Sequence, residues 1–228
     1  MANEMKRICI DPGHGGSDSG ATNGAFTEKY AVLEIGKELE KELVKRGYQV
    51  YMTRKEDVYN TPYQKAKYGN QVGADVFVSI HCNSAESESA HGTETLSYDL
   101  NGDSFRLARA IQESLIAATG LTDRGVKQRK DLIVLNSTSM PAALVETAFL
   151  SNREEKLLLM DNAFRIKTAK AIAQGIDTYF GKGEESVTVE EAKKIIQDKC
   201  SFDDNTMQYL SFYRYADSMI IRLAERMK

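Results

Sequence analysis

Two of the three histidines of this chain stand at the ends of short apolar runs, where they could hold a metal ion. His14 follows the run "RICI" inside the glycine-rich stretch "DPGHGG", and His81 follows "DVFVSI". Two histidines with one carboxylate are a common ligand set for catalytic zinc, which keeps its fourth position for water or substrate. A single histidine at a strand end is more often a hydrogen-bonded structural residue, but two in matching positions favour a zinc site.

The third ligand would be a carboxylate from a nearby loop or helix start, and Glu28 fits this position best. Thr27 is a suitable N-cap residue, so Glu28 is expected on the first turn of a helix that follows the His14 loop. The alternative for Glu28 is an interaction with the helix dipole alone, worth about 0.3 to 1 kcal/mol. Glu94 and Glu34 are the weaker candidates.

The elements that must position these residues alternate between strands and helices. Apolar and alternating segments predict strands, and residues repeating three and four apart predict amphipathic helices. The segments with strand character are 7–10, 48–53, 75–83, 92–98, 132–135 and 141–150, and the predicted helices cover 32–46, 61–72, 104–119 and 163–180. This order predicts an α/β fold with a twisted central sheet, largely parallel and flanked by helices, whose ligands bind beyond the carboxyl ends of strands. His14, His81 and Glu146 fall at or near such ends.

Local signals indicate where two of the helices begin. Thr61 is placed to cap a helix that has Pro62 at its first position. Ser151 and Glu154 have the spacing of a capping box, which predicts another helix start after the last apolar segment.

The composition changes after residue 180. We expect a main domain over 1–180, a short linker "GKGEES" at 181–186, and a small all-helical C-terminal appendage over 187–228. The appendage reads as two helices around the breaker "CSFDDN". A segment of about 40 residues rarely sustains a core by itself, so it is expected to dock on something.

The overall composition excludes several classes of protein. Hydrophobic residues make up 42% and charged residues 28%, which is typical of a soluble globular chain. The net charge is −3 and the basic residues are scattered, which argues against a nucleic-acid partner. No apolar run is long enough for membrane insertion, and the first residues lack the apolar core of a signal peptide. Cys9, Cys82 and Cys200 have no CxxC spacing and are expected to be reduced thiols in a protein made in the cytoplasm.

A set of motifs occurs in one order between residues 5 and 180. They are "IDPGHGG", "TEK" at 27–29, "TR" at 53–54, "VSIHCNS" at 78–84, "GTET" at 92–95 and "PAALVETAFLSN" at 141–152. With these motifs the sequence resembles the zinc-dependent N-acetylmuramoyl-L-alanine amidases of the Amidase 3 type. The resemblance implies one zinc per chain held by His14, Glu28 and His81, a catalytic glutamate at Glu146, and peptidoglycan as the substrate.

The chemistry of the residues agrees with that assignment. Zinc lowers the pKa of bound water toward about 7, but a general base must still take the proton and return it to the leaving amine. Glu146 can do both. The alternative role for Glu146 is a structural one in a buried salt bridge, because burying a glutamate after the apolar run "AALV" costs free energy unless its charge is paired. Asp11, Asn83 and Thr95 are expected to orient the ligands or the substrate. His91 departs from the family pattern and is expected at the rim of the cleft.

The glycines around His14 have a role of their own. We expect Gly13, Gly15 and Gly16 to let the backbone turn sharply and to leave open space, so that a bulky polymer can reach the metal. A phosphate-binding loop is the alternative, but the GxxxxGK[ST] and GxGxxG patterns are absent.

These observations favour an enzyme that cuts the amide bond between the lactyl group of N-acetylmuramic acid and L-alanine of the stem peptide. A zinc peptidase acting on stem peptides is the nearest alternative, and a catalytically inactive wall-binding or regulatory protein is the alternative from another class. Without a signal peptide, the protein is expected to act on the wall after release, as an endolysin passing through holin pores or as an autolysin on lysis.

The C-terminal appendage is expected to target the wall or to mediate self-association. Its acidic and basic residues nearly balance, so binding to anionic wall polymers by charge alone is not expected. Tyr209, Phe212, Tyr213 and Tyr215 would stack on sugars or fill a helical interface. Docking on the main domain is the alternative.

Overall fold

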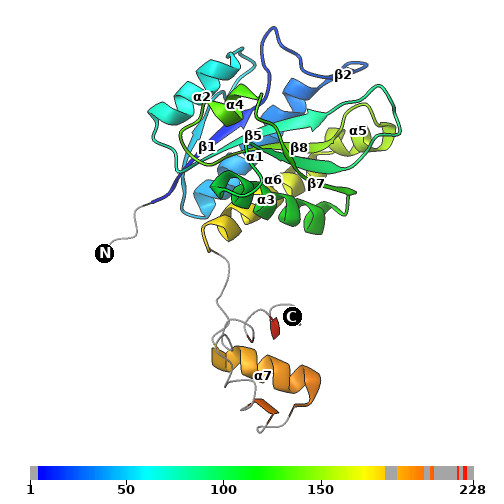
Figure 1. The fold of residues 1–228 in the computed structure, drawn as a ribbon. Coiled ribbons are helices and arrows are strands. Elements are labelled where there is room, and N and C mark those ends of the chain that lie inside the picture. The colour runs from blue at the N-terminus through cyan, green and yellow to red at the C-terminus, as the bar shows by residue number, and fades with distance from the viewer. Residues whose placement is uncertain (1–4, 183–188, 203–205, 208–219, 221–222, 225–228) are drawn as a thin grey trace. The chain divides into compact units, whose positions relative to one another are not determined.

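The computed structural model describes residues 5–182, 189–202, 206–207, 220 and 223–224. The chain divides into two compact units, Met1–Phe180 and Gly181–Lys228, and each is described by itself (Figure 1). Among the described residues, no helix combines the length and the apolar character that a membrane crossing requires.

The first unit is built on a six-stranded sheet. Its strands in spatial order are β4 (Gln49–Met52), β1 (Arg7–Pro12), β5 (Val76–Asn83), β8 (Ala142–Phe149), β6 (Thr93–Ser97) and β7 (Asp123–Gln128). The first four run parallel, β6 pairs antiparallel with β8, and β7 pairs parallel with β6. The predicted fold, a largely parallel sheet flanked by helices, is confirmed.

Helices cover both faces of the sheet (Figure 1). One face carries the large apolar core with α1 (Glu28–Lys45), α3 (Asp103–Thr119) and α6 (Asn162–Tyr179). The other face carries a smaller core with α4 (Ile133–Asn136), and α2 (Pro62–Gln71) packs beside α4. The less extensive cover on this second face leaves the carboxyl ends of the strands accessible there.

The alternation of side chains along β5 sends the polar residues to that second face. Val76, Val78 and Ile80 belong to the large core, whereas Phe77 belongs to the smaller one. Because successive side chains of a strand point to opposite faces, His81 lies on the same face as Phe77. The alternation therefore places the His81 side chain near the end of β5, at the edge of the smaller core.

One of the two helix starts follows its predicted signal and the other does not. Thr61 caps α2 in a capping box with Gln64. Ser151, however, is not the cap of α5 (Arg153–Met160): Asn152 is, and its side chain accepts hydrogen bonds from the backbone N–H groups of residues 154 and 155. The Ser151 hydroxyl instead accepts a hydrogen bond from the N–H of Ala85, at 3.1 Å, so the serine is engaged by the neighbouring loop.

Other segments also differ from the sequence expectations. The segment 132–135 is not a strand, because Leu132 is the N-cap of the short helix α4 and residues 133–135 lie within it, and β7 was not predicted. The burial pattern of β7 shows no alternation of buried and exposed residues, because it is an edge strand whose side chains are partly or fully exposed. Two short strands, β2 (Thr22–Asn23) and β3 (Phe26–Thr27), form a small hairpin just before α1.

The second unit contains α7 (Val189–Cys200), where the first helix of the appendage was predicted. Its described apolar residues form a small cluster of Ala192, Ile196, Met207, Ile220 and Ala224. The aromatic residues Tyr209, Phe212, Tyr213 and Tyr215, and most of the predicted linker, lie outside the described residues.

Candidate metal centre and active site

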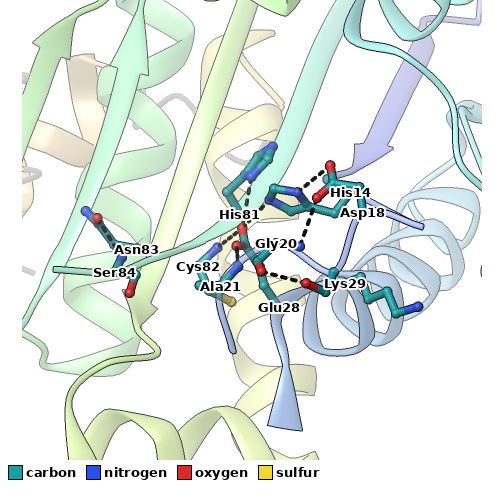
Figure 2. Close-up of polar contacts among 12 residues, drawn as sticks. His14, Asp18, Gly20, Ala21, Glu28, Lys29, His81, Cys82, Asn83 and Ser84 are labelled. Carbon is teal, nitrogen blue, oxygen red and sulfur yellow. Dashed lines mark hydrogen bonds and ion pairs between the residues drawn. The ribbon is translucent and has the colours of Figure 1, made fainter. Parts of the chain in front are cut away.

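Three side chains from separate elements converge on one point at the carboxyl edge of the sheet (Figure 2). Oε1 of Glu28 lies 2.9 Å from Nε2 of His14 and 2.9 Å from Nδ1 of His81. One donor atom from each of these residues lies within 4.8 Å of the others. Donors bound tetrahedrally to zinc at 2.0–2.2 Å are roughly 3.3 Å apart, a value between the 2.9 Å separations and the 4.8 Å limit of this group. The donor set fits zinc in both type and spacing.

The loop after β1 fixes which nitrogen of His14 faces this point. Nδ1 of His14 lies 2.9 Å from Oδ2 of Asp18, and the N–H of Gly20 donates to the other carboxylate oxygen of Asp18. The Asp18 carboxylate on Nδ1 orients the ring so that Nε2 faces the point shared with Glu28, which is how a carboxylate orients a metal-binding histidine. Sequence reasoning did not single out Asp18; its position four residues after His14 was the available signal.

The glycines near His14 make room for the chain itself. A Cβ on Gly13 would lie 2.4 Å from Cε1 of His81, and one on Gly20 would lie 2.5 Å from Oε2 of Glu28. A Cβ on Gly15 would meet the backbone of Val58 at 2.2 Å. The positive φ angles of Gly15 and Gly16 confirm the predicted sharp turn. The prediction that Gly13, Gly15 and Gly16 leave open space for a polymer is wrong, because the His81 ring and the backbone of residues 58 and 59 fill that space.

Glu28 is buried and held as an anion. Oε1 accepts a hydrogen bond from the N–H of Cys82, and Oε2 accepts one from the N–H of Ala21. Burial alone would raise the pKa of Glu28, but its hydrogen bonds with His14 and His81 outweigh this effect and hold the pKa well below its ordinary value. Thr27 stands at the N-cap of α1 as predicted, although its side chain makes no capping hydrogen bond.

The two weaker candidates for the third metal ligand, Glu34 and Glu94, form ion pairs with other residues. Glu34 forms an ion pair with Lys37 within α1. Glu94 is buried on β6, and its Oε2 lies 2.8 Å from both Nε of Arg124 and Nζ of Lys127. Both carboxylates are thus neutralised by neighbouring cations.

Glu146 lies on β8, in register with His81 of β5 on one side and with Glu94 of β6 on the other. Its side chain is largely buried, and its Oε2 has no hydrogen-bond partner among the described residues. Burial raises the pKa of Glu146 to about 7, and the negative charges of Glu28 and Glu94 act in the same direction against the opposing effect of His81 and His14. A carboxyl group in this state can hold or release a proton near neutral pH.

Leaving such a group without a partner is costly. An unsatisfied buried polar atom costs about 1–3 kcal/mol, so its presence in a folded protein calls for a functional explanation. A water molecule or a substrate atom beside His14, Glu28 and His81 would supply the missing partner.

Asp11 and Asn83 lie next to the ligand residues but touch other groups. Asp11 forms a buried ion pair with Lys65 at 3.0 Å and accepts a hydrogen bond from Ser79 at 2.7 Å. Lys65 in turn donates to the carbonyl of Pro12, just before the His14 loop. Nδ2 of Asn83 donates to Oε1 of Glu94 at 2.9 Å.

Thr95 and His91 lie away from the ligand point. The Thr95 hydroxyl is fully buried and donates to Oε1 of Gln112, on the face covered by α3. His91 is exposed, and its Nδ1 contacts the carbonyl of Ser89 at 2.8 Å.

Arg54 connects the two segments that carry His14 and Glu28. Its buried guanidinium donates to the carbonyls of Pro12 at 3.0 Å and Gly13 at 2.7 Å, and also to that of Lys29 at 2.8 Å. The five N–H donors of arginine allow one side chain to hold both segments. In the sequence, Arg54 was noted only as part of the "TR" motif.

A cleft of about 270 Å³ opens beside the two histidines. His14, His81 and Asp11 line one side of it, and residues 131–134 at the start of α4 line the other. The metal-ligand group therefore faces a space that a peptide or a sugar can enter.

Comparison with known proteins agrees with this arrangement. The family model described as N-acetylmuramoyl-L-alanine amidase, Amidase 3, matches residues 8–178. The N-acetylmuramoyl-L-alanine amidase LytC of Bacillus subtilis is 36% identical over 189 residues, which cover 79% of this chain and 38% of LytC. The endolysin of Bacillus phage SPP1 is 36% identical over 178 residues, which cover 75% of this chain and 65% of the endolysin. The chain thus spans less than two thirds of the length of either relative.

The same likeness is found in solved structures. The catalytic domain of CwlV, an N-acetylmuramoyl-L-alanine amidase from Bacillus (Paenibacillus) polymyxa var. colistinus, superposes with a TM-score of 0.74 at 37% identity. The match covers 78% of this chain and 99% of that domain. From its fold, its motifs and these matches, the chain belongs to the Amidase 3 family of N-acetylmuramoyl-L-alanine amidases.

Proposed function

We propose that this protein is a zinc-dependent hydrolase of peptidoglycan that cleaves the amide bond between N-acetylmuramic acid and L-alanine of the stem peptide. The observation that carries the proposal is the convergence of His14, Glu28 and His81 beside Glu146, whose Oε2 is buried without a partner among the described residues. Membership in the amidase family supports the choice of bond.

One zinc ion per chain would be held by His14, Glu28 and His81. When bound, zinc polarises the scissile carbonyl and acidifies water. Asp18 orients His14, and the backbone N–H groups of Cys82 and Ala21 orient Glu28. These contacts favour a rigid ligand set.

Glu146 would carry the proton through the reaction. As a base it takes a proton from the attacking water while the water oxygen bonds to the lactyl carbonyl carbon. It then gives that proton to the nitrogen of L-alanine as the C–N bond breaks, so the products are a free amine and a lactyl carboxylic acid, which releases its proton to water and becomes a carboxylate. A pKa of about 7 suits both directions of this transfer.

Product analysis tests the reaction and separates it from the two alternatives. Purified walls are digested with the protein, with and without a chelator, and the muropeptides are analysed by mass spectrometry. We expect free lactyl carboxylates and free L-alanine amines, loss of both with chelator, and recovery on adding zinc. New amino groups inside the stem peptide without lactyl carboxylates would indicate a zinc peptidase, and wall binding without any cleavage would indicate an inactive wall-binding protein.

We also propose a separate function for each segment of the chain. Residues 1–180 would form the catalytic domain, 181–186 a linker, and 187–228 a wall-targeting or self-association module. The protein would act on the wall after release, as an endolysin or an autolysin; its likeness to the SPP1 endolysin supports the former. Wall binding and mass in solution are compared between the full chain and a chain ending at residue 183, and unchanged values for both would contradict the proposed module.

A further inference from the structure

A pair of cationic side chains, Arg124 and Lys127, contacts Glu94, the neighbour of Glu146 in the sheet, and has no role in the reaction described so far. Both come from the edge strand β7, and both contact Glu94 of β6. Glu94 is in register with Glu146 on the neighbouring strand β8. Adjacent strands lie about 5 Å apart, so Glu94 is one strand and β7 two strands from Glu146, which places the cation pair within roughly 10 Å of the proposed proton carrier.

The Arg124 guanidinium is held in place before any substrate arrives. Its Nε lies 2.8 Å from Oε2 of Glu94, and its central carbon lies 4.8 Å from the ring centroid of Phe149. Although its guanidinium is stacked and paired, about one-third of the Arg124 side chain is exposed. Such a fixed arginine loses little freedom when it binds an anion.

The charges at this position do not balance. Among the described residues, Glu94 is the carboxylate paired directly with the two cations Arg124 and Lys127, and it also accepts a hydrogen bond from Asn83. Nη1 of Arg124 further donates to the carbonyl of His91 at 3.4 Å, and the charge of Arg124 acts on the buried Glu155. Arginine has five N–H donors and lysine three, so donors of both side chains remain for a second acceptor. Nearby Arg129 adds no surplus charge, because it is paired with Asp131 at 2.7 Å.

We propose that Arg124 and Lys127 bind a free carboxylate of the stem peptide and make the protein selective for it. This inference rests on the proposed amidase function. In peptidoglycan the residue after L-alanine is D-glutamate linked through its side chain, so its α-carboxylate is free unless it is amidated. That group lies about one residue, roughly 4 to 7 Å, beyond the scissile nitrogen. With a hydrogen bond of about 3 Å from that nitrogen to Glu146, this length spans the separation of roughly 10 Å between Glu146 and the cation pair.

The test compares two soluble disaccharide tetrapeptides that differ only in whether this α-carboxylate is free or amidated. For the parent protein, kcat/KM should be at least about 10-fold higher for the free carboxylate, as expected for a hydrogen-bonded charge. In the double variant Arg124→Gln with Lys127→Gln the ratio should fall to near one. Zinc content and the rate on the amidated substrate should stay close to those of the parent.

Arg109→Gln is the matched control, since Arg109 is an exposed arginine paired with Glu113 on α3. Lys127→Gln alone keeps Arg124 stacked on Phe149, and it should lower the ratio if the double variant does not fold. A parent ratio near one, or an unchanged ratio in the Lys127→Gln and double variants, overturns the proposal. If the parent cleaves neither substrate, the amidase function itself fails, whereas equal cleavage of both refutes only the selectivity.

Discussion

Replacing Glu146 with glutamine should change both the stability and the activity of this protein, in opposite directions. The native state holds the Glu146 proton more tightly than the unfolded chain does, because burial raises its pKa from 4.5 to about 7. Between these two values the native state binds more protons, so this group lowers the free energy of unfolding as pH rises. At about 1.36 kcal/mol per pKa unit, the loss reaches about 3 kcal/mol above roughly pH 7 and is absent below roughly pH 4.5.

Glutamine has nearly the same shape and never ionises, so the variant is free of this loss. A buried amide without a partner adds an offset of about 1–3 kcal/mol, but that offset does not depend on pH. The stability of Glu146→Gln relative to the parent should therefore increase by about 3 kcal/mol between about pH 4.5 and about pH 8. Urea unfolding of both proteins with a chelator present measures it, and other titrating groups cancel in the comparison. A change smaller than about 1 kcal/mol would mean that Glu146 is not the buried, proton-holding carboxyl described above.

The same variant should be almost inactive. General acid–base assistance contributes about 10²- to 10⁴-fold, so wall hydrolysis by Glu146→Gln should fall at least about 100-fold. Its zinc content should remain that of the parent, because the three ligand residues are untouched. Activity above about a tenth of the parent rate would refute the proton-transfer role, and loss of zinc would make Glu146 a ligand.

The remaining predictions concern the metal centre, and zinc titration measures the change in affinity in each of them. Glu28→Ala should weaken zinc binding by more than about 100-fold while Glu94→Ala leaves it nearly unchanged; the reverse result would mean that the wrong carboxylate was chosen. Arg54→Lys removes the fork that joins the two ligand-bearing segments, so zinc affinity should fall about 10-fold even where circular dichroism shows an intact fold, and parent-like affinity would exclude a positioning role. Gly13→Ala puts a methyl group on the His81 ring, which should cost about 1–3 kcal/mol of stability together with zinc affinity, and a neutral outcome would show that the loop can move aside.

The residue types and periodic patterns of the sequence were enough to predict the sheet, its covering helices and the three candidate ligands. His14 and His81 follow short apolar runs that favour buried strands, and parallel strands end at a common edge. Glu28 follows a capping residue and opens an amphipathic helix, which fixes it to a helix start. Each of these signals is local, so no knowledge of the tertiary contacts was needed.

The edge strand and one helix cap were decided by tertiary contacts. β7 is partly or fully exposed along its length and carries no apolar alternation, so only its pairing with β6 makes it a strand. Ser151 and Asn152 are both good caps, and the N–H of Ala85 from a distant loop binds the serine and leaves the asparagine to cap α5.

The contacts around the candidate ligand residues could likewise not be predicted from the sequence. Thr95 and Glu94 are neighbours in the chain, yet strand alternation sends the first toward Gln112 of α3 and the second toward Glu146 and the cation pair. The clamp by Arg54 and the packing of Gly13 on His81 join residues more than 40 positions apart. Contacts of this kind depend on how whole elements are stacked and registered, and that is fixed only when the complete chain has folded.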